Sequence, residues 1–207
     1  MALANYTDLT ASVAAWAHRS NDSELVAIIP DFVTLAEARI SRDLRLRKQI
    51  TTATALTTAN VQTVTLPADW LEFENVSVAG NPEIQLTYVP VEHLDSRFPA
   101  GGTSGQPVFY TIEADNLLIG PIPDTVYTLN LIYYARFPAL ATNSTNWLMT
   151  NHPNIYLFAC LIEAMFYTQD TEQLNLYNAR YQAELSQLQT VDDRSTHSGS
   201  ALRVKVI

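Results

Sequence analysis

The sequence predicts an α+β fold in which helices from both ends of the chain form a body around an inserted antiparallel β lobe. Apolar residues recur at helical spacing before residue 49 and again after residue 137. Between these limits, short β-prone segments alternate with turn residues, a pattern typical of a small antiparallel sandwich or barrel. We therefore expect a helical body of residues 1–49 and 137–190, a β sandwich or barrel-like lobe of residues 50–136, and an extended C-terminal tail of residues 191–207.

The N-terminal part of the body is expected to be helical. Apolar residues from Leu9 to Ala17 have helical spacing, with Thr7 as the expected N-cap. Asp22 offers the start of a second helix, and Pro30 then predicts either the first turn of a further helix or a break before it. The apolar stripe that follows, and that we expect to be buried, consists of Phe32, Leu35, Ala36, Ile40 and Leu44.

The middle of the chain changes to β patterns. The expected strands are Val61–Leu66, Glu74–Val78, Ile84–Val89, Val108–Ile112, Leu117–Ile119 and Tyr127–Ala135. Gly80-Asn81-Pro82 supplies one turn, and the polar residues 113–116 predict a hairpin. Residues 101–105 are rich in glycine and predict a loop.

Helical periodicity returns after Phe137. Asn151, followed by His152-Pro153, predicts the start of one helix, and Asp170 with Gln173 resembles a capping box at the start of another. The stripe of the first helix is Ile155, Phe158, Ala159, Ile162 and Phe166. The stripe of the second is Leu174, Tyr177, Tyr181, Leu185 and Leu188. Both stripes are expected to pack against the N-terminal helices.

The net charge of −9 is concentrated in the lobe, where residues 50–136 carry nine acids and two bases. Binding to nucleic acid depends mainly on Lys and Arg neutralising phosphates, so this region is not expected to wrap DNA. Acidity also favours solubility, without any partner. The most apolar stretch, Ile155–Met165, is interrupted by Glu163 and is shorter than the ~20 residues of a bilayer span, so no membrane contact is expected.

The sequence shows no pattern of catalysis or metal binding. It contains neither phosphate-binding glycine motif nor a G-x-S-x-G elbow. The four histidines, His18, His93, His152 and His197, stand in separate segments without metal-ligand spacing. Cys160, the single cysteine, lies in an apolar run and is expected to be a buried, inert thiol. We expect no enzymatic activity, no catalytic residue, no cofactor and no metal.

A basic segment is the first candidate contact surface. It consists of Arg39, Arg42, Arg45, Arg47 and Lys48, opposed only by Asp43. One interpretation is a helix C-terminus, whose partial negative charge favours cations. The other is a basic patch that docks on an acidic partner or meets DNA. Both interpretations remain open from the sequence.

The C-terminal hexapeptide is the second candidate. It consists of Leu202, Arg203, Val204, Lys205, Val206 and Ile207, after a Ser198-Gly199-Ser200 hinge. Alternating apolar and basic residues can add a strand to an exposed sheet edge of another subunit. The alternative is a frayed chain end. The hinge followed by β-prone residues favours the contact interpretation.

Several segments, in order over nearly the whole chain, together carry a family resemblance. In the first half they are Ala4–Leu9, Ile29–Ile40, Arg42–Arg45 and Leu66–Glu72. In the second half they are Tyr133–Leu140, Thr145–Met149, Tyr156–Leu157, Leu161–Ala164 and Ser198–Ser200 before Leu202-Arg203. With these segments the chain resembles the head-to-tail adaptor (connector) proteins of short-tailed bacteriophages.

The resemblance implies a ring, usually of twelve copies, between the portal protein and the tail nozzle or tail-tube protein. The helical body would contact neighbouring copies and the portal, the β lobe would face the tail, and the terminal arm would reach along the portal. DNA would pass through the channel without sequence-specific binding, and an acidic lumen would let it slide. The expected location is the head–tail junction of the virion, after synthesis in the host cytoplasm.

Two other classes of protein remain as alternatives. Another structural virion component, such as a tail-tube or nozzle subunit, would be mostly β, which the helical ends argue against. A tail-associated cell-wall hydrolase should show paired catalytic carboxylates or a metal triad. Neither alternative has support in the motifs above.

Overall fold

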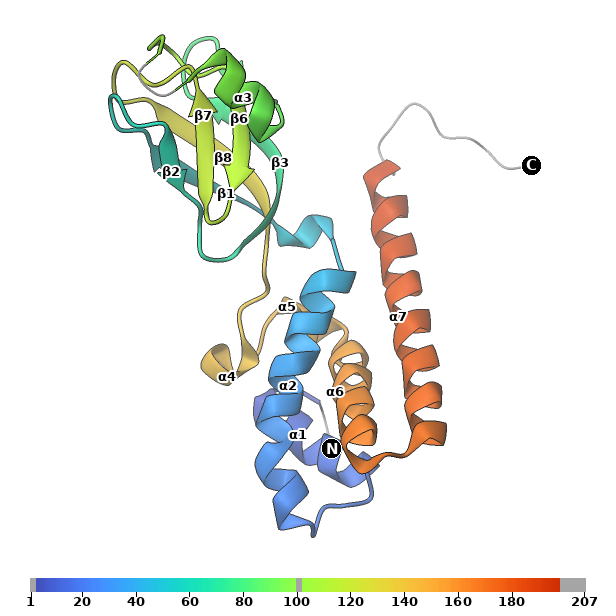
Figure 1. Ribbon diagram of the computed structural model, residues 1–207. Coiled ribbons are helices and arrows are strands. Elements are labelled where there is room, and N and C mark those ends of the chain that lie inside the picture. The colour runs from blue at the N-terminus through green and yellow to red at the C-terminus, as the bar shows by residue number, and fades with distance from the viewer. Residues whose placement is uncertain (1–2, 100–101, 198–207) are drawn as a thin grey trace, which may run out of the picture. The chain divides into compact units, whose positions relative to one another are not determined.

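The computed structural model describes residues 3–99 and 102–197 (Figure 1). The chain forms two compact units. The helical unit combines Met1–Leu46 with Phe137–Ile207, and the β unit is Arg47–Arg136. Within the described residues, all strands lie in the β unit and most helices lie in the helical unit, which confirms the predicted α+β fold class.

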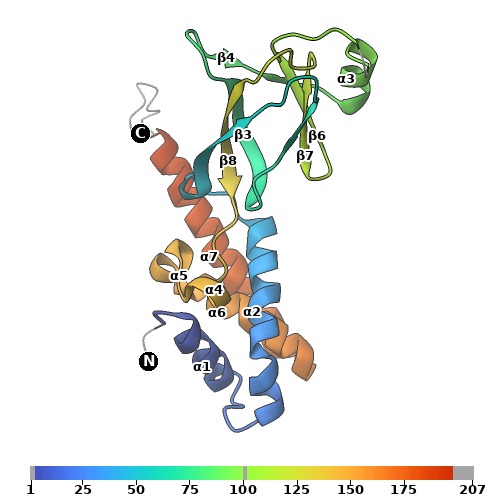
Figure 2. The same cartoon turned by 90° about the vertical axis from the view of Figure 1, so that its left-hand side faces the viewer.

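Helix α6 lies at the centre of the helical unit. The helices of this unit are α1 (Tyr6–Trp16), α2 (Ser23–Asp43), α4 (Leu140–Asn143), α5 (Trp147–Asn151), α6 (Pro153–Thr168) and α7 (Thr171–His197). α6 contacts α1, α2, α5 and α7, and Figure 2 shows α1 on one side of α2 and the C-terminal end of α6 on the other. A helix covered on several sides must be apolar around most of its surface, and α6 buries nearly every residue between Ile155 and Met165.

The start of α1 differs from the prediction. Asn5, not Thr7, is the N-cap, and its Oδ1 accepts a hydrogen bond from the Asp8 N–H at 2.9 Å. The Tyr6 N–H donates to the Ser144 carbonyl oxygen at 2.7 Å. This contact with a distant segment holds residue 6 in the first turn, so the helix begins before Thr7.

Two other predicted N-caps are confirmed. The Asp22 carboxylate accepts the Leu25 N–H at 3.2 Å at the start of α2. The Asp170 carboxylate accepts the Gln173 N–H at 3.1 Å at the start of α7. Aspartate satisfies an otherwise unpaired donor at these positions and also favours the positive end of the helix dipole.

Pro30 lies inside α2, so both interpretations offered for it are wrong. A proline at this position removes the N–H that would bond the carbonyl of residue 26, at a cost of roughly 3 kcal/mol. The neighbouring Ile29, Phe32 and Val33 are all buried. Burial of this apolar face offsets the lost hydrogen bond, and the helix continues to Asp43.

Helix α7 also runs further than predicted. The helical body was expected to end at residue 190 and an extended chain to begin at residue 191, but the helix continues to His197. The polar residues from 191 to 197 therefore belong to the last part of this helix and not to an extended chain. The rest of the predicted tail, residues 198–207, lies outside the described residues.

The predicted apolar stripes of α2, α6 and α7 form the core of the helical unit with two exceptions, and on the predicted stripe of α1 Trp16 is also 48% exposed. Phe32, Ala36, Ile40 and Leu44 are buried, as are Tyr181, Leu185 and Leu188 of α7. Leu35, predicted to be buried, is 52% exposed, and Phe166, also predicted to be buried, is 73% exposed. In both cases the stripe is wider than the face that neighbouring helices cover.

The β unit is a sandwich of two four-stranded sheets. Its strands are β1 (Ile50–Leu56), β2 (Thr63–Thr65), β3 (Trp70–Val78), β4 (Ile84–Gln85), β5 (Thr87–Tyr88), β6 (Phe109–Glu113), β7 (Asn116–Gly120) and β8 (Thr128–Ala135). The strand orders are β1-β8-β3-β4 and β2-β7-β6-β5. Val76 and Leu131 of the first sheet and Leu117 and Ile119 of the second belong to one apolar cluster. The sandwich alternative of the prediction is therefore observed, with no closed barrel in the described part of the chain.

Three details of the β prediction need correction. The expected strand Ile84–Val89 is split at Leu86, and β4 joins the first sheet while β5 joins the second. β5 pairs parallel to β6, so the second sheet is mixed rather than antiparallel. The strand β1, the helix α3 (Val91–Arg97) and the short helix η1 (Arg47–Gln49) are additional elements of this unit that were not predicted. The predicted hairpin around residues 113–116 is confirmed as β6 and β7. In this hairpin Phe109 lies opposite Gly120 at one end and Glu113 lies opposite Asn116 at the other.

Candidate functional site

Arg39, the first residue of the basic segment, lies within the helical unit rather than on a free basic patch. Its guanidinium forms an ion pair with the Glu163 carboxylate of α6, with an Nε–Oε1 distance of 3.2 Å. The side chains are 29% and 15% exposed. The pair links α2 to α6, two helices that are far apart in the sequence.

Arg45 and Arg42 lie at the C-terminal end of α2. The Arg45 guanidinium donates to the carbonyl oxygens of Ser41 at 2.6 Å and Leu44 at 2.8 Å. These are the carbonyl groups left unpaired at a helix end, so Arg45 fits the helix-terminus interpretation. Arg42 is exposed in the last turn of the same helix.

The remaining two bases of the segment belong to the other unit. Arg47 and Lys48 are exposed in η1 of the β unit. The five bases are therefore contiguous in sequence but divided between two compact units. The second candidate surface, Leu202 to Ile207, lies outside the described residues.

Part of the acidity of the β unit has local structural roles. The Glu83 carboxylate accepts hydrogen bonds from the Ser77 hydroxyl and from the Asn130 amide, the latter at 2.7 Å. These two bonds lower the pKa of Glu83. Other acids, among them Glu74, Glu92, Asp95, Glu113 and Asp115, lie exposed on the unit.

The predicted inert thiol is found where the sequence placed it. Cys160 is completely buried in α6, and burial raises the pKa of its thiol, with smaller contributions from Glu37 and Glu163. A thiol in this state is a poor nucleophile at neutral pH. Within residues 3–99 and 102–197, His, Cys, Asp and Glu side chains do not assemble into a possible metal site, and none of the helices is long and apolar enough to span a bilayer.

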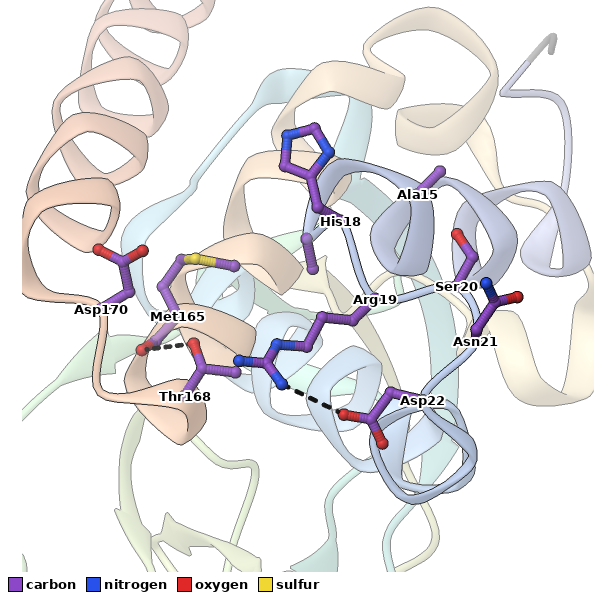
Figure 3. A pocket seen from close by; sticks show the side chains of 10 residues that line it. Ala15, His18, Arg19, Ser20, Asn21, Asp22, Met165, Thr168 and Asp170 are labelled. Atoms are coloured by element: carbon purple, nitrogen blue, oxygen red, sulfur yellow. Dashed lines mark hydrogen bonds and ion pairs between the residues drawn. The ribbon is translucent and has the colours of Figure 1, made fainter.

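A polar cleft of about 920 Å³ lies where the α1–α2 connection meets the C-terminal end of α6 (Figure 3). Arg19 extends into it and donates to Asp22 at 3.4 Å. Asp22 also caps α2, and the Thr168 hydroxyl donates to the Ala164 carbonyl of its own helix at 3.1 Å. Asp22 and Thr168 of this cleft thus form hydrogen bonds with backbone groups near the ends of the helices that line it.

Apolar surface is the feature of the helical unit that the sequence analysis missed. Leu35, Phe166 and Tyr167 are each at least half exposed. A separate apolar groove of about 490 Å³ lies between α1 and α2. The sequence held no signal that marks this surface, because Leu35 and Phe166 follow the periodicity of core residues and only the structure shows that they are exposed.

A surface with protruding aromatic side chains and an apolar groove is suited to contacts with other proteins. Comparison with protein families shows that the chain is of the class of phage adaptor proteins. The chain belongs to the SU10 adaptor protein family, whose model matches residues 4–205. This match confirms the resemblance to head-to-tail adaptors of short-tailed phages. Membership of this family indicates a structural phage protein. A search of curated proteins gives no significant match.

Proposed function

We propose that this chain is the head-to-tail adaptor of a short-tailed phage and forms a ring of twelve copies. The ring joins the portal protein to the tail nozzle or tail-tube protein at the head–tail junction, and the genome passes through it. The observation that carries the proposal is the family match over residues 4–205, because it includes both compact units. A match to one unit alone would support only a shared fold.

The division of the molecule into two units is consistent with a connecting role. Each unit has its own buried apolar clusters, so each can present a separate surface to a separate partner. We assign the helical unit to contacts with neighbouring copies and the portal. The β unit is assigned to the tail side.

The charge of the β unit supports free passage of DNA. Residues 50–136 carry nine acids and two bases, and exposed carboxylates repel phosphates. Where these carboxylates face the channel, the genome moves past without sequence-specific contacts. Residues 202–207 and the exposed bases Arg42, Arg47 and Lys48 are the proposed portal contacts.

Native mass spectrometry of the protein with the portal protein of the same phage tests this function. We expect a complex with one adaptor per portal subunit, and deletion of residues 202–207 should abolish it. The matched control keeps the composition of these six residues but reorders them to Leu-Val-Val-Ile-Arg-Lys, which removes the apolar–basic alternation. If the segment binds as a strand, we expect this variant to lose the complex with the portal protein as well.

Two results would contradict parts of the proposal. Absence of any portal complex with the full-length chain would overturn the adaptor function. A complex that forms equally well without residues 202–207 would leave the adaptor function intact and remove the tail from the portal contacts.

A further inference from the structure

Three apolar side chains on α2 and α6 of the helical unit are each at least half exposed, and we call them the knob: Leu35, Phe166 and Tyr167. The Tyr167 ring packs on Phe32 of α2, with ring centroids 5.8 Å apart. Leu35 lies one helical turn from Phe32 on one side and from Arg39 on the other. Arg39 is joined to Glu163, one turn before Tyr167 on α6, so the three residues lie on adjoining faces of α2 and α6.

Phe166 is the most prominent part of the knob. Its side chain borders a small hollow between α2 and α7, lined also by Ile162 and Leu174, and yet it is 73% exposed. Transfer of an aromatic side chain out of water buries roughly 150–250 Å². A core-patterned aromatic residue that its own fold leaves in water indicates a partner surface.

The complementary feature is on the same unit. The groove between α1 and α2 is lined mainly by apolar side chains, together with the hydroxyl-bearing Thr7, Thr10 and Ser20. The apolar lining consists of Tyr6, Ala11, Ala14 and Ala15 of α1 and Val26, Ile29 and Pro30 of α2. Small alanine side chains leave the space, and Val26 is 43% exposed. Figure 2 shows α1, which forms one wall of the groove, and the C-terminal end of α6, which carries Phe166 and Tyr167, on opposite sides of α2.

The charges beside the two features are opposite. Arg42 is exposed on the same stripe of α2 as Leu35 and Arg39. Asp31, beside the groove, is exposed and close enough to contribute to the raised pKa of Tyr6, after burial and the larger charge effects of Glu37 and Cys160. An exposed acid thus lies beside the groove, whereas the base on the stripe of Leu35 that stays outside an ion pair with Glu163 is the exposed Arg42.

We infer that Phe166 of one copy inserts into the α1–α2 groove of the next copy and that this contact closes the ring. The inference rests on the proposed adaptor function. A cyclic ring needs two different surfaces on each subunit, and the helical unit supplies an apolar projection and an apolar groove with opposite flanking charge. Contacts of this kind concentrate their binding energy in a buried aromatic anchor.

Two blocking variants test the contact. Phe166→Ser removes the projection and leaves the groove, whereas Ala11→Trp fills the groove, at an exposed position, and leaves the projection. Leu176→Ser is the matched control, because Leu176 is a 50% exposed residue of α7 outside both features. Each protein is measured by native mass spectrometry, alone and with the portal protein.

We expect each blocking variant to lose the ring, with each subunit contact weakened about 30-fold, as for a typical aromatic hot spot. The Leu176→Ser variant should form rings like the unaltered protein. An equimolar mixture of the two blocking variants should give a one-to-one heterodimer and no ring, because it retains one intact projection and one intact groove.

The outcomes separate this inference from the proposed function. Rings that persist in Phe166→Ser or Ala11→Trp, or a mixture without the heterodimer while the unaltered protein forms rings, would overturn the knob-and-groove contact and leave the adaptor function standing. An unaltered protein that forms no ring, even with the portal, would overturn both. Loss of the ring in Leu176→Ser would show that the effect is not specific to the knob.

Discussion

The helical unit and the β unit reach a stable core in different ways. The helical unit joins two stretches of chain, Met1–Leu46 and Phe137–Ile207, that are separated by the entire β unit. Its core therefore depends on contacts between distant residues, such as Arg39 with Glu163. The β unit is one continuous stretch, Arg47–Arg136. Within it, β8 pairs with β1 and β3, and β2 pairs with β7, although these strands are far apart in the sequence.

This difference bears on how such a protein acquires its contacts. A continuous inserted unit can change its loops and edge strands with little effect on the helices, because its apolar clusters are its own. The helical unit has less freedom, since α6 is covered by α1, α2 and α7. Contacts that must be the same in every copy of a ring are therefore better placed on the helical unit.

The largest expected effects come from cavities in the two cores. Leu161 of α6 and Leu129 of β8 are both completely buried, in separate apolar clusters. Leu161→Ala should lower the free energy of unfolding of the helical unit by about 2–5 kcal/mol, and Leu129→Ala should do the same to the β unit. Amide hydrogen exchange, read separately for α6 and β8, measures each effect.

In each variant, the unit without the substitution serves as the internal reference for the unit with the cavity. We expect Leu161→Ala to leave the protection of β8 amides unchanged and Leu129→Ala to leave that of α6 unchanged. The conservative variants Leu161→Met and Leu129→Met serve as controls and should each cost less than about 1.5 kcal/mol. An equal loss of protection in both units would show that they unfold together and would break the distinction.

Smaller effects are expected from two matched tyrosines, one in each unit. The Tyr181 hydroxyl donates to Asp43 at 3.0 Å in the helical unit, and the Tyr133 hydroxyl donates to Asp69 at 2.9 Å in the β unit. Burial and the nearby carboxylate raise the pKa of Tyr133 to about 12. For Tyr181→Phe and Tyr133→Phe we expect losses of about 0.5–1.5 kcal/mol, because the exposed carboxylates can regain hydrogen bonds from water.

Urea denaturation of the two phenylalanine variants checks this prediction. Asp43→Asn and Asp69→Asn are the matched controls, since asparagine keeps an oxygen acceptor for the tyrosine. A loss in Tyr181→Phe far above that in Tyr133→Phe would mean that a bond between the two separate chain stretches of the helical unit stabilises more than a bond of similar length within the continuous β unit.

Much of the fold follows from local patterns in the sequence. Apolar spacing in α2, α6 and α7 and the hairpin of β6 and β7 are short-range features, and burial enforces them. Pro30 was misread because the cost of a proline is local whereas the burial that offsets it is tertiary. The split at Leu86 was missed because a continuous β-prone run does not show that its two halves pair with different sheets.

The candidate surfaces were harder to predict for the same reason. The basic segment is continuous in sequence, but Arg39 finds its partner at Glu163, far along the chain. Leu35 and Phe166 have the periodicity of core residues, and only the positions of the neighbouring helices show that the described part of the helical unit leaves both side chains at least half exposed. Periodicity therefore identifies apolar residues correctly but does not separate a core from an interface.

The smallest expected effect is the pH-dependent contribution of two glutamates, Glu37 and Glu83, to the stability of their units. The sign of this contribution differs between the two units. In the helical unit, Glu37 accepts the Leu140 N–H at 2.8 Å, and burial raises its pKa above the ordinary 4.5, although the hydrogen bond opposes this. In the β unit, hydrogen bonds from Ser77 and Asn130 lower the pKa of Glu83 below 4.5.

The two shifts have opposite consequences for stability. Glu37 binds a proton more readily in the folded than in the unfolded chain, so its contribution falls as the pH rises from 4.5 through its raised folded pKa. Glu83 binds a proton less readily when folded, so its contribution is present above pH 4.5 and is lost as the pH falls through its lowered folded pKa.

Urea titrations between pH 3 and 7, with hydrogen exchange to assign each unit, measure both contributions through Glu37→Gln and Glu83→Gln. Glu37→Gln should stabilise the helical unit at pH 7 and match the unaltered protein at low pH, where Glu37 is protonated. Glu83→Gln should destabilise the β unit at pH 7, with a difference that shrinks toward pH 3. If both variants shift stability in the same direction at pH 7, one of the two carboxylates does not have the environment described above. The one that departs from its expected sign then identifies the unit whose local electrostatics must be revised.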